Sequence, residues 1–433
     1  MTNIENRNYK IYKIKIVKNY IYITLAFALL ALVSCKQGDK ASGMLSAENL
    51  QTELQKRLIN ASAGDKILLP EGTFSFKRSI SLNDTPDITI KGAGKGKTIL
   101  SFKGQIEGAE GMLIKNVKGI TLEGFTIADS KGDAIKVQEC TNVIMRDLET
   151  TWTNGKLATN GAYGLYPVSS TNVLMEDCEA SFAMDAGIYV GQSNNVVVRN
   201  NYVHDNVAGL EIENTVNGEV YGNRAIGNTG GMLIFDMPDL PQANGDRIKF
   251  YDNYMENNNG ENFAPKGMVV STIPPGSGMI LMSHSNIEAY NNTIKGHKSI
   301  GVAVNSWLFT GVPFESEEFD PYATNIYLHD NVITGTEGPT DNTTDYGKLM
   351  TAAFGGKAYD IMIDGIFKPN SDGVPTASYC FKNNGDVSFV NLNAHLGDSP
   401  AEIAENKSHD MSPFECELPD FDTAEHDAWL ASN

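Results

Sequence analysis

Carboxylate and phenol side chains recur at matching positions of short segments in the middle of the chain. Tyr166, Tyr189 and Glu211 each come two residues after a glycine, and Glu213 follows Glu211 by two positions. On a β-strand, residues two apart face the same side, with their Cβ atoms about 7 Å apart. Two carboxylates at that spacing suit an acid/base pair for a glycosidic bond or a Ca²⁺ site, and an ordinary exposed acidic strand is the third interpretation.

Neighbouring segments add candidate catalytic and substrate-binding residues to the same face of these strands. Lys136 stands one segment before Tyr166, where it would act as a base or neutralise a uronate. Tyrosine rings stack on the CH faces of sugars, so the expected ligand is a polysaccharide. If the protein is an enzyme, we expect hydrolysis or β-elimination with a tyrosine (Tyr166 or Tyr189) or Lys136 as the base, and with Glu211 and Glu213 neutralising charge. The expected substrate-binding residues are Gln138, Phe235, Asp236 and Asn305, and the expected Ca²⁺ ligands are Glu211, Glu213 and Asp236.

These segments belong to a repeat. The start pairs Thr171-Asn172, Asn194-Asn195 and Asn217-Gly218 follow one another every 23 residues. Five residues after each pair we expect a turn column in left-handed backbone: Gly124, Asp147, Asp177, Asn200, Asn223, Asp252, Asn291 and Asp330. Eight residues after it we expect a buried column: Ile127, Thr150, Ala180, Val203, Ile226, Met255, Ile294 and Ile333. A fixed period with two-residue alternation and Asn/Gly punctuation predicts a stacked β-solenoid.

In these in-register blocks, over about residues 60 to 335, the chain resembles the right-handed parallel β-helix proteins of the pectin-lyase-like superfamily. The segment before them, residues 46–60, places Leu50, Leu54 and Leu58 on one helical stripe, as expected of a helix that covers the open end of a β-stack. The predicted fold class is all-β: a single-stranded parallel β-helix with an N-terminal helical cap and a C-terminal cap. The expected boundaries are 46–335 for the capped solenoid and 336–433 for the C-terminal cap, with 338–351 as a loop or linker.

Strand alternation assigns the two sides of the glycine-led column. The expected inward residues are Ile135, Leu165, Ile188, Leu210, Met232, Met279 and Val302; the expected outward residues are Lys136, Tyr166, Tyr189, Glu211, Leu233, Ile280 and Ala303. Because rungs stack about 4.8 Å apart, the first four outward residues should form a ladder of roughly 15 Å, the length of a few sugar residues. An apolar groove around Leu233, Phe235, Ile280 and Met282 would instead favour a second hypothesis, a non-catalytic envelope scaffold that binds a protein.

Insertions indicate where a ligand would bind. The extra residues of the longer repeats lie at 152–160, at 237–245, before Gly278 and at 307–322, and all of them flank the same column. Solenoid insertions tend to gather on the binding face.

Reaction signatures of known β-helix enzymes are missing. An Arg-rich pectate-lyase strand is not visible, the Asp-Pro-His-Glu motif of mannuronan epimerases is absent, and Arg247-Ile248-Lys249 matches only one of the polygalacturonase motifs. The pattern formed by Tyr163–Val168, Asp185–Gln192 and Gly230–Asp236 with Pro238–Pro241 resembles a group of bacterial β-helix proteins without a settled activity. That resemblance implies the fold and a cell-envelope location, and it leaves the reaction open.

The amino terminus resembles a bacterial lipoprotein signal. A basic leader and an apolar run end in Leu32-Val33-Ser34-Cys35, so we expect removal of residues 1–34, lipidation of Cys35, a tether over 35–45 and attachment of a monomer to the outer membrane through lipid alone. Removing five Lys/Arg and one Glu changes the formal charge from −19 to −23. Such acidity disfavours nucleic acid as a partner.

Four cysteines remain beyond Cys35. Cys380 and Cys416 both fall in the expected cap, where a disulfide suits an exported protein, and we expect that pair to be joined. Cys140 and Cys178 are expected to be small buried hydrophobic residues.

Overall fold

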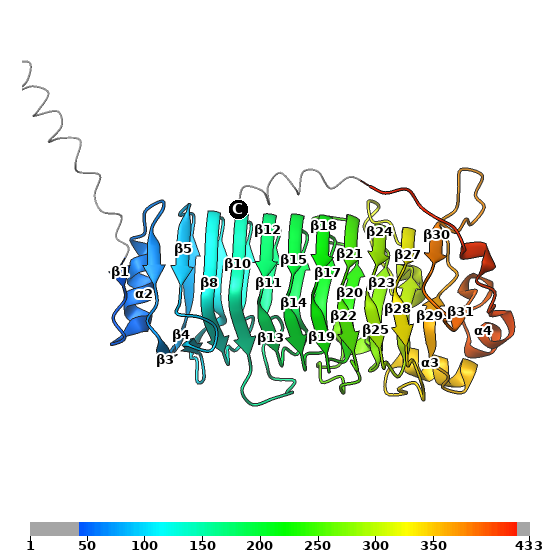
Figure 1. Ribbon diagram of the computed structural model, residues 1–433, viewed down its shortest axis with the longest axis horizontal. Helices are drawn as coiled ribbons and strands as arrows, with labels where there is room; N and C mark the ends of the chain where they lie inside the picture. The colour runs from blue at the N-terminus through cyan, green and yellow to red at the C-terminus, as the bar shows by residue number, and fades with distance from the viewer. Residues whose placement is uncertain (1–42, 422–433) are drawn as a thin grey trace, which may run out of the picture. The chain divides into compact units, whose positions relative to one another are not determined.

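Residues 43–421 are described by the computed structural model, and they form a stack of parallel β-strand rungs (Figure 1). Sheet A contains β1 (Gly43–Met44), β2 (Lys66–Leu68), β3 (Gly72–Ser75), β5 (Ile88–Lys91), β6 (Thr98–Ser101), β8 (Lys118–Ala128), β10 (Thr141–Thr151), β12 (Thr171–Glu176), β13 (Glu179–Ser181), β15 (Asn194–Arg199), β16 (Tyr202–His204), β18 (Val216–Tyr221), β19 (Arg224–Ile226), β21 (Asp246–Tyr251), β22 (Tyr254–Glu256), β24 (Ser285–Tyr290), β25 (Thr293–Lys295), β27 (Thr324–His329), β28 (Val332–Thr334) and β30 (Tyr379–Lys382).

Sheet B is the glycine-led column of the sequence. It contains β4 (Arg78–Asn83), β7 (Glu107–Lys115), β9 (Ile135–Gln138), β11 (Leu165–Val168), β14 (Ala186–Gly191), β17 (Ala208–Glu213), β20 (Gly230–Phe235), β23 (Ser277–Met282), β26 (Ile300–Asn305), β29 (Tyr359–Ile363) and β31 (Phe389–Asn391). Each strand pairs in parallel with the strand one rung away, for example β14 with β17 and β17 with β20. The parallel β-helix expected from the repeat is confirmed.

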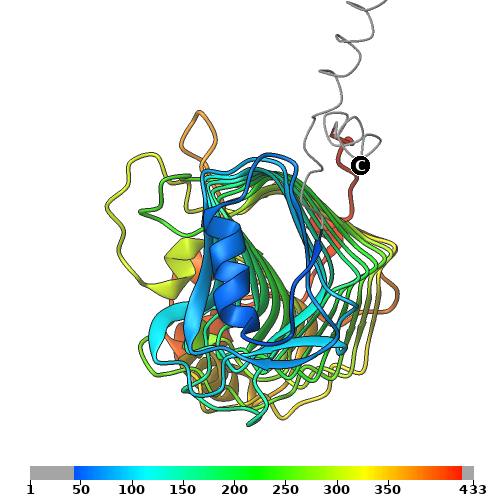
Figure 2. The same ribbon diagram turned by 90° about the vertical axis from the view of Figure 1, so that its left-hand side faces the viewer.

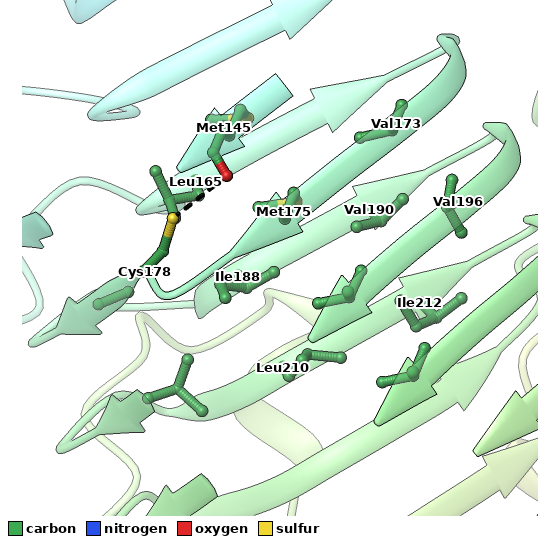
Figure 3. Packing of buried hydrophobic residues seen from close by; sticks show 14 of the residues in the cluster. Met145, Leu165, Val173, Met175, Cys178, Ile188, Val190, Val196, Leu210 and Ile212 are labelled. Carbon is green, nitrogen blue, oxygen red and sulfur yellow. Dashed lines mark hydrogen bonds between the residues drawn. The ribbon is translucent and has the colours of Figure 1, made fainter. Parts of the chain in front are cut away.

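The core fills the space between the sheets. The expected inward residues of sheet B are all buried, and they pack against aliphatic residues of sheet A such as Val173 and Val196 (Figure 3). Cys178 lies in the same layer, with its sulfur 3.5 Å from the carbonyl of Met145 (Figure 3), and both Cys140 and Cys178 are free and buried as expected.

One buried asparagine ladder fixes the turns. Asn201, Asn223, Asn253, Asn292, Asn331 and Asn384 stack in consecutive rungs, and each side-chain amide donates to the carboxamide oxygen of the next. Each amide also bonds a backbone carbonyl, so these buried polar groups are satisfied along the core.

The expected repeat register is wrong at one step. Val196 pairs with Gly218, so the block that follows Asn194 begins at Val216-Asn217 rather than at Asn217-Gly218. In that rung Gly222, with φ +65°, occupies the left-handed turn position expected for Asn223. Ala225 accordingly pairs with Val203 in the buried column, and Ile226 lies half-buried outside it. A rung one residue shorter is tolerated because glycine adopts the turn conformation without strain.

Helix α2 (Leu50–Ile59) covers the first rungs, as the Leu50, Leu54 and Leu58 stripe predicted. These three leucines are buried, and Gln55 bonds the backbone N–H and C=O of Ser81 in β4. Figure 2 looks along the stack and shows α2 lying across its near end. Helix α2 thereby covers the hydrophobic core at this end.

The carboxyl-terminal part extends the solenoid further than expected. Strands β29, β30 and β31 continue the two parallel sheets, so rungs persist past residue 335. The segment expected as a loop or linker contains helix α3 (Asp345–Phe354), which packs on helix α4 (Pro400–Asn406). Shorter 3-10 turns are η1 (Val269–Thr272), η2 (Trp307–Thr310), η3 (Ala394–Leu396) and η4 (Ser412–Phe414).

The expected disulfide is present. Cys380 in β30 is joined to Cys416 after η4, with their Cα atoms 4.9 Å apart. The predicted signal segment and Cys35 lie outside the described residues. Within the described part of the chain, no helix has the length and apolar character needed to cross a membrane.

A candidate active site on the outer face of sheet B

The outward row of sheet B runs as the alternation predicted. Lys136 pairs with Tyr166, Tyr189 with Glu211, and Glu211 with Leu233 on consecutive rungs. Since these strands are in register, the five expected catalytic residues, Lys136, Tyr166, Tyr189, Glu211 and Glu213, come together on four neighbouring strands, β9, β11, β14 and β17.

Three tyrosines form the centre of this group. The ring of Tyr163 lies 4.6 Å from that of Tyr166 and 4.4 Å from that of Tyr189, measured between centroids. Tyr166 and Tyr189 meet edge to face at 4.9 Å, and the ammonium of Lys136 lies 4.7 Å from the centre of the Tyr166 ring. This is a packed aromatic cluster with one cation on its open side.

Four carboxyl groups surround the tyrosines. Glu213 accepts a hydrogen bond from the Tyr189 hydroxyl, across one rung. Asp185 interacts electrostatically with Tyr163, Glu211 and Glu213, and Asp133 does so with Lys136. We name Asp133, Lys136, Tyr163, Tyr166, Asp185, Tyr189, Glu211 and Glu213 the Tyr/carboxyl cluster.

Burial changes the acidity of these groups. It raises the pKa of Asp133 to about 6, where Lys136 partly opposes the rise, and it raises the pKa of Glu213 to about 7, where the bond from Tyr189 opposes it. Burial also raises the pKa of Asp185 to about 7, where the hydrogen bond with Tyr163 opposes the rise. Burial lifts the pKa of Glu211 well above its usual range, and repulsion by Asp185 and Glu213 adds to that rise. The pKa values of the three phenols rise as well, first through burial and then through the neighbouring carboxylates. Several carboxyls of the cluster therefore hold protons near neutral pH.

The interpretation as an exposed acidic strand is wrong. Glu211 and Glu213 are only 3% and 4% exposed. The insertion before β23, residues 259–276, folds over this part of sheet B and contributes Val270 and Ile273 to an apolar cluster with Tyr189, Leu233 and Phe235. Phe235 is therefore buried against the insertion rather than presented to a ligand. Strand alternation correctly predicted that these side chains point outward from sheet B. It did not predict that the insertion covers them.

Asp236 plays a structural part beside the cluster. Its Oδ2 accepts a hydrogen bond of 2.7 Å from the N–H of Gly245, which closes the 237–245 insertion. Burial raises its pKa well above the usual range, and its charge contributes to the raised pKa of Glu213. His284 lies 4.0 Å from its Oδ1, and burial lowers the pKa of that histidine to about 4.

The geometry offers no support for the expected Ca²⁺ site. Across residues 43–421, no group of three or more His, Cys, Asp or Glu side chains is arranged to hold a metal ion. Glu213 is engaged by Tyr189 and Asp236 by Gly245, so two of the three expected ligands already serve other partners.

Two expected substrate-binding residues lie apart from one another. Gln138 ends β9, where its amide bonds Glu139 at 2.9 Å, and Asn305 ends β26. Six rung steps separate these strands in sheet B, roughly 29 Å at the usual spacing. Gln138 borders the Tyr/carboxyl cluster, and Asn305 does not.

Three members of the cluster were missed from the sequence. Asp133 and Tyr163 stand two residues before the inward Ile135 and Leu165, where strand alternation would have placed them on the inner side. Both residues precede their strands, β9 and β11, so the alternation does not apply to them. Asp185 immediately precedes β14, and no periodic signal marked it.

Comparison with known proteins supports the fold. A family model described as a right-handed β-helix region matches residues 147–319, and the solenoid is a right-handed parallel β-helix. Over 216 residues the chain is 28% identical to the preneck appendage protein of Bacillus phage PZA, a match that covers 42% of this chain and 25% of that protein. The chain thus matches about a quarter of the length of that relative.

Solved structures with a similar course of the chain include polysaccharide-acting enzymes. The A-module of the Azotobacter vinelandii mannuronan C-5 epimerase AlgE4 has a TM-score of 0.49 at 15% identity, over 80% of this chain and 93% of that one. The exopolygalacturonase of Thermotoga maritima has a TM-score of 0.43 at 13% identity, over 64% of this chain and 76% of that one. Both likenesses concern the fold alone.

Proposed function

We propose that this β-helix binds and chemically modifies polysaccharide, with the Tyr/carboxyl cluster as its active site. The observation that carries the proposal is the concentration of four carboxyls and three phenols on one face, with the single ammonium of Lys136 on its open side. Burying like-charged acids together costs stability, and hydrophobic side chains would fill the same rungs at lower cost. Such arrangements of perturbed acids are typical of catalytic sites.

The acidities suit general acid/base work on a glycosidic bond. Asp133 is half-buried on the open side of the cluster, and burial raises its pKa to about 6. As the acid, it would donate its proton to the leaving oxygen while a second carboxylate takes a proton from the attacking water. Asp185 and Glu213, each with a pKa raised to about 7, would hold or exchange protons through the Tyr163 and Tyr189 hydroxyls.

Hydrolysis fits the cluster better than β-elimination. Elimination from a uronate requires cations that neutralise the substrate carboxylate, and Lys136 is the one cation within the cluster. The cluster contains four carboxyl groups and only this one cation.

The apolar surface that the alternative scaffold hypothesis requires is partly covered. That hypothesis required an apolar groove around Leu233, Phe235, Ile280 and Met282, and all four residues pack in one cluster with the 259–276 insertion. Leu233 and Phe235 are buried under the insertion, whereas Ile280 and Met282 are half-buried beside it and still present apolar surface.

The test is a glycan screen with matched variants. Purified protein is incubated with neutral polysaccharides and with mannuronan and polygalacturonate, and new reducing ends and unsaturated products are measured. Asp133→Asn and Glu213→Gln should abolish turnover, whereas Glu256→Gln should not, because Glu256 lies in β22 of sheet A, where it pairs with Lys295. Failure to bind or convert any glycan in the panel would refute the proposal.

We further propose that the protein is exported and anchored by lipid at Cys35. The basic leader, the apolar run and the residues before Cys35 support this. Cells grown with labelled palmitate should label the wild type and not Cys35→Ser. Equal labelling of both would refute the anchor.

A further inference from the structure

The outer face of sheet B is closed on one side of the Tyr/carboxyl cluster and open on the other. Every residue of β14, β17 and β20 is buried. On β9 the outward residues Lys136 and Gln138 are half-buried, as are Leu113 and Lys115 on β7. Tyr163 and Tyr166 lie at the transition, and both are half-buried.

The closed side is built by the insertion at residues 259–276, which we name the plug. Ile273 lies directly on Gly230, where an added Cβ would stand 2.9 Å from its Cγ2. Asn262 holds the plug together by donating to the carbonyls of Val270 and Ile273, each at 3.0 Å. Thr229 ties it to the solenoid with a 2.9 Å bond to the carbonyl of Glu261.

A second insertion meets the plug at the margin of the sheet. Lys156, in the loop before β11, pairs with Asp205 at 3.0 Å and donates to the carbonyl of Gly227 at 3.2 Å. The same ammonium lies 3.0 Å from where a Cβ on Gly260 would stand, at the start of the plug. The plug and this loop therefore contact one another. Because the plug packs over the outer face where every residue of β14, β17 and β20 is buried, a chain lying along sheet B cannot continue past the cluster.

The open side offers a short track of mixed polarity. In register, Ser81, Leu113 and Lys136 form one outward row and Asn83, Lys115 and Gln138 the next. From β4 to β11 the track covers three rung steps, roughly 14 Å, which is enough for a few sugar residues.

We propose that the site receives the end of a glycan chain and acts on it from that end. This inference rests on the proposed function and adds its mode of action. The chain lies over β4, β7 and β9, its terminal residue contacts Tyr163 and Tyr166, and the plug stops it there. Only a terminal bond can then lie beside Asp133 and Lys136.

The first test uses the unmodified protein, so it does not depend on the folding of a variant. A polysaccharide that the screen identifies as a substrate is digested, and product sizes are followed from the earliest time points. We expect one short product throughout, a slow fall in polymer length, and no cleavage of a cyclic glycan with the same linkage. Early oligosaccharides of mixed length, or cleavage of the cyclic glycan, would overturn the inference.

The second test compares the oligosaccharide affinities of two variants, one with a bulky residue on the track and one with the same residue on the surface of the plug. Ser81→Trp obstructs the open side and should weaken binding of a hexasaccharide by at least about tenfold while affecting a disaccharide little. Val269→Trp adds the same bulk to the plug at a position that is 50% exposed and should leave both affinities unchanged. Equal binding of the hexasaccharide by both variants would also overturn the inference.

The two proposals fail differently. If internal bonds are cleaved and Asp133→Asn abolishes that cleavage, the active site stands and the chain-end inference falls. If no glycan is bound or converted, the proposed function itself falls and the inference falls with it.

Discussion

The hydroxyl of Tyr189 donates a hydrogen bond to Glu213, which lies one rung away on the same outer face. Both side chains are buried, so neither has water as a substitute partner. Parallel in-register pairing sets this contact, because the residue opposite Glu213 on β14 is Gly191, which has no side chain and leaves room for the Tyr189 ring.

Removal of that hydroxyl should change the acidity of Glu213. The hydrogen bond from Tyr189 lowers the pKa of Glu213 against the effect of burial, so Tyr189→Phe should raise this pKa above its value of about 7. The buried carboxyl also loses a partner, at a cost of about 1–3 kcal/mol in the free energy of unfolding. Carbon NMR of the glutamate carboxyls, followed against pH, measures the first effect, and urea denaturation measures the second. An unchanged Glu213 titration would show that the hydrogen bond is not formed in solution.

The buried acids should make the protein less stable as the pH rises. Burial raises the pKa of Glu213 to about 7 from an ordinary value of 4.5, and that of Asp185 to about 7 from 3.8. The folded state therefore keeps protons that the unfolded state has already lost, and stability falls as the pH passes from about 4 to about 7. Urea midpoints should be lower at pH 8 than at pH 5. The double variant Glu211→Gln, Glu213→Gln should show a weaker pH dependence than the wild type, and an unchanged dependence would locate the titrating groups elsewhere.

Much of this arrangement followed from local rules. Strand alternation placed Lys136, Tyr166, Tyr189 and Glu211 on one outward row because a parallel stack repeats the same side-chain direction in every rung. The same reasoning failed where a rung is one residue shorter. Gly222 takes the turn position in that rung, and the adjacent Asn223 made a fixed 23-residue period look continuous.

The burial of the site could not be derived in this way. Residues 259–276 have no repeat pattern, and their position depends on contacts distant in sequence, such as Ile273 on Gly230. Asp185 joined the cluster for a related reason, since it precedes β14 in a turn that alternation does not describe. The insertions indicated the functional face, and only the structure shows that one of them closes it.

The contact between Ile273 and Gly230 should be measurable as a coupling. Gly230→Ala places a Cβ 2.9 Å from the Ile273 side chain and should cost about 1–3 kcal/mol of folding free energy through overpacking. In an Ile273→Ala background the added methyl has room, so the same substitution should cost much less. Urea denaturation of the two single variants and the double variant completes the cycle. Additive effects would mean that the plug does not rest on Gly230.

Reduction of the Cys380–Cys416 disulfide should loosen the carboxyl-terminal cap and leave the central rungs intact. The bridge closes a segment with a sequence separation of 36 residues, for which loop-closure entropy predicts about 4 kcal/mol. A solenoid transmits stability mainly between neighbouring rungs, so the loss should be greatest in β30 and around η4. Hydrogen exchange of the double variant Cys380→Ser, Cys416→Ser should show faster exchange in those elements and unchanged protection in β14 and β17.

Cys178→Ser is the control, because that thiol is buried and free. Its exchange effects should stay near β13. If the double variant instead loses protection uniformly along the stack, the cap and the central rungs unfold as one cooperative unit.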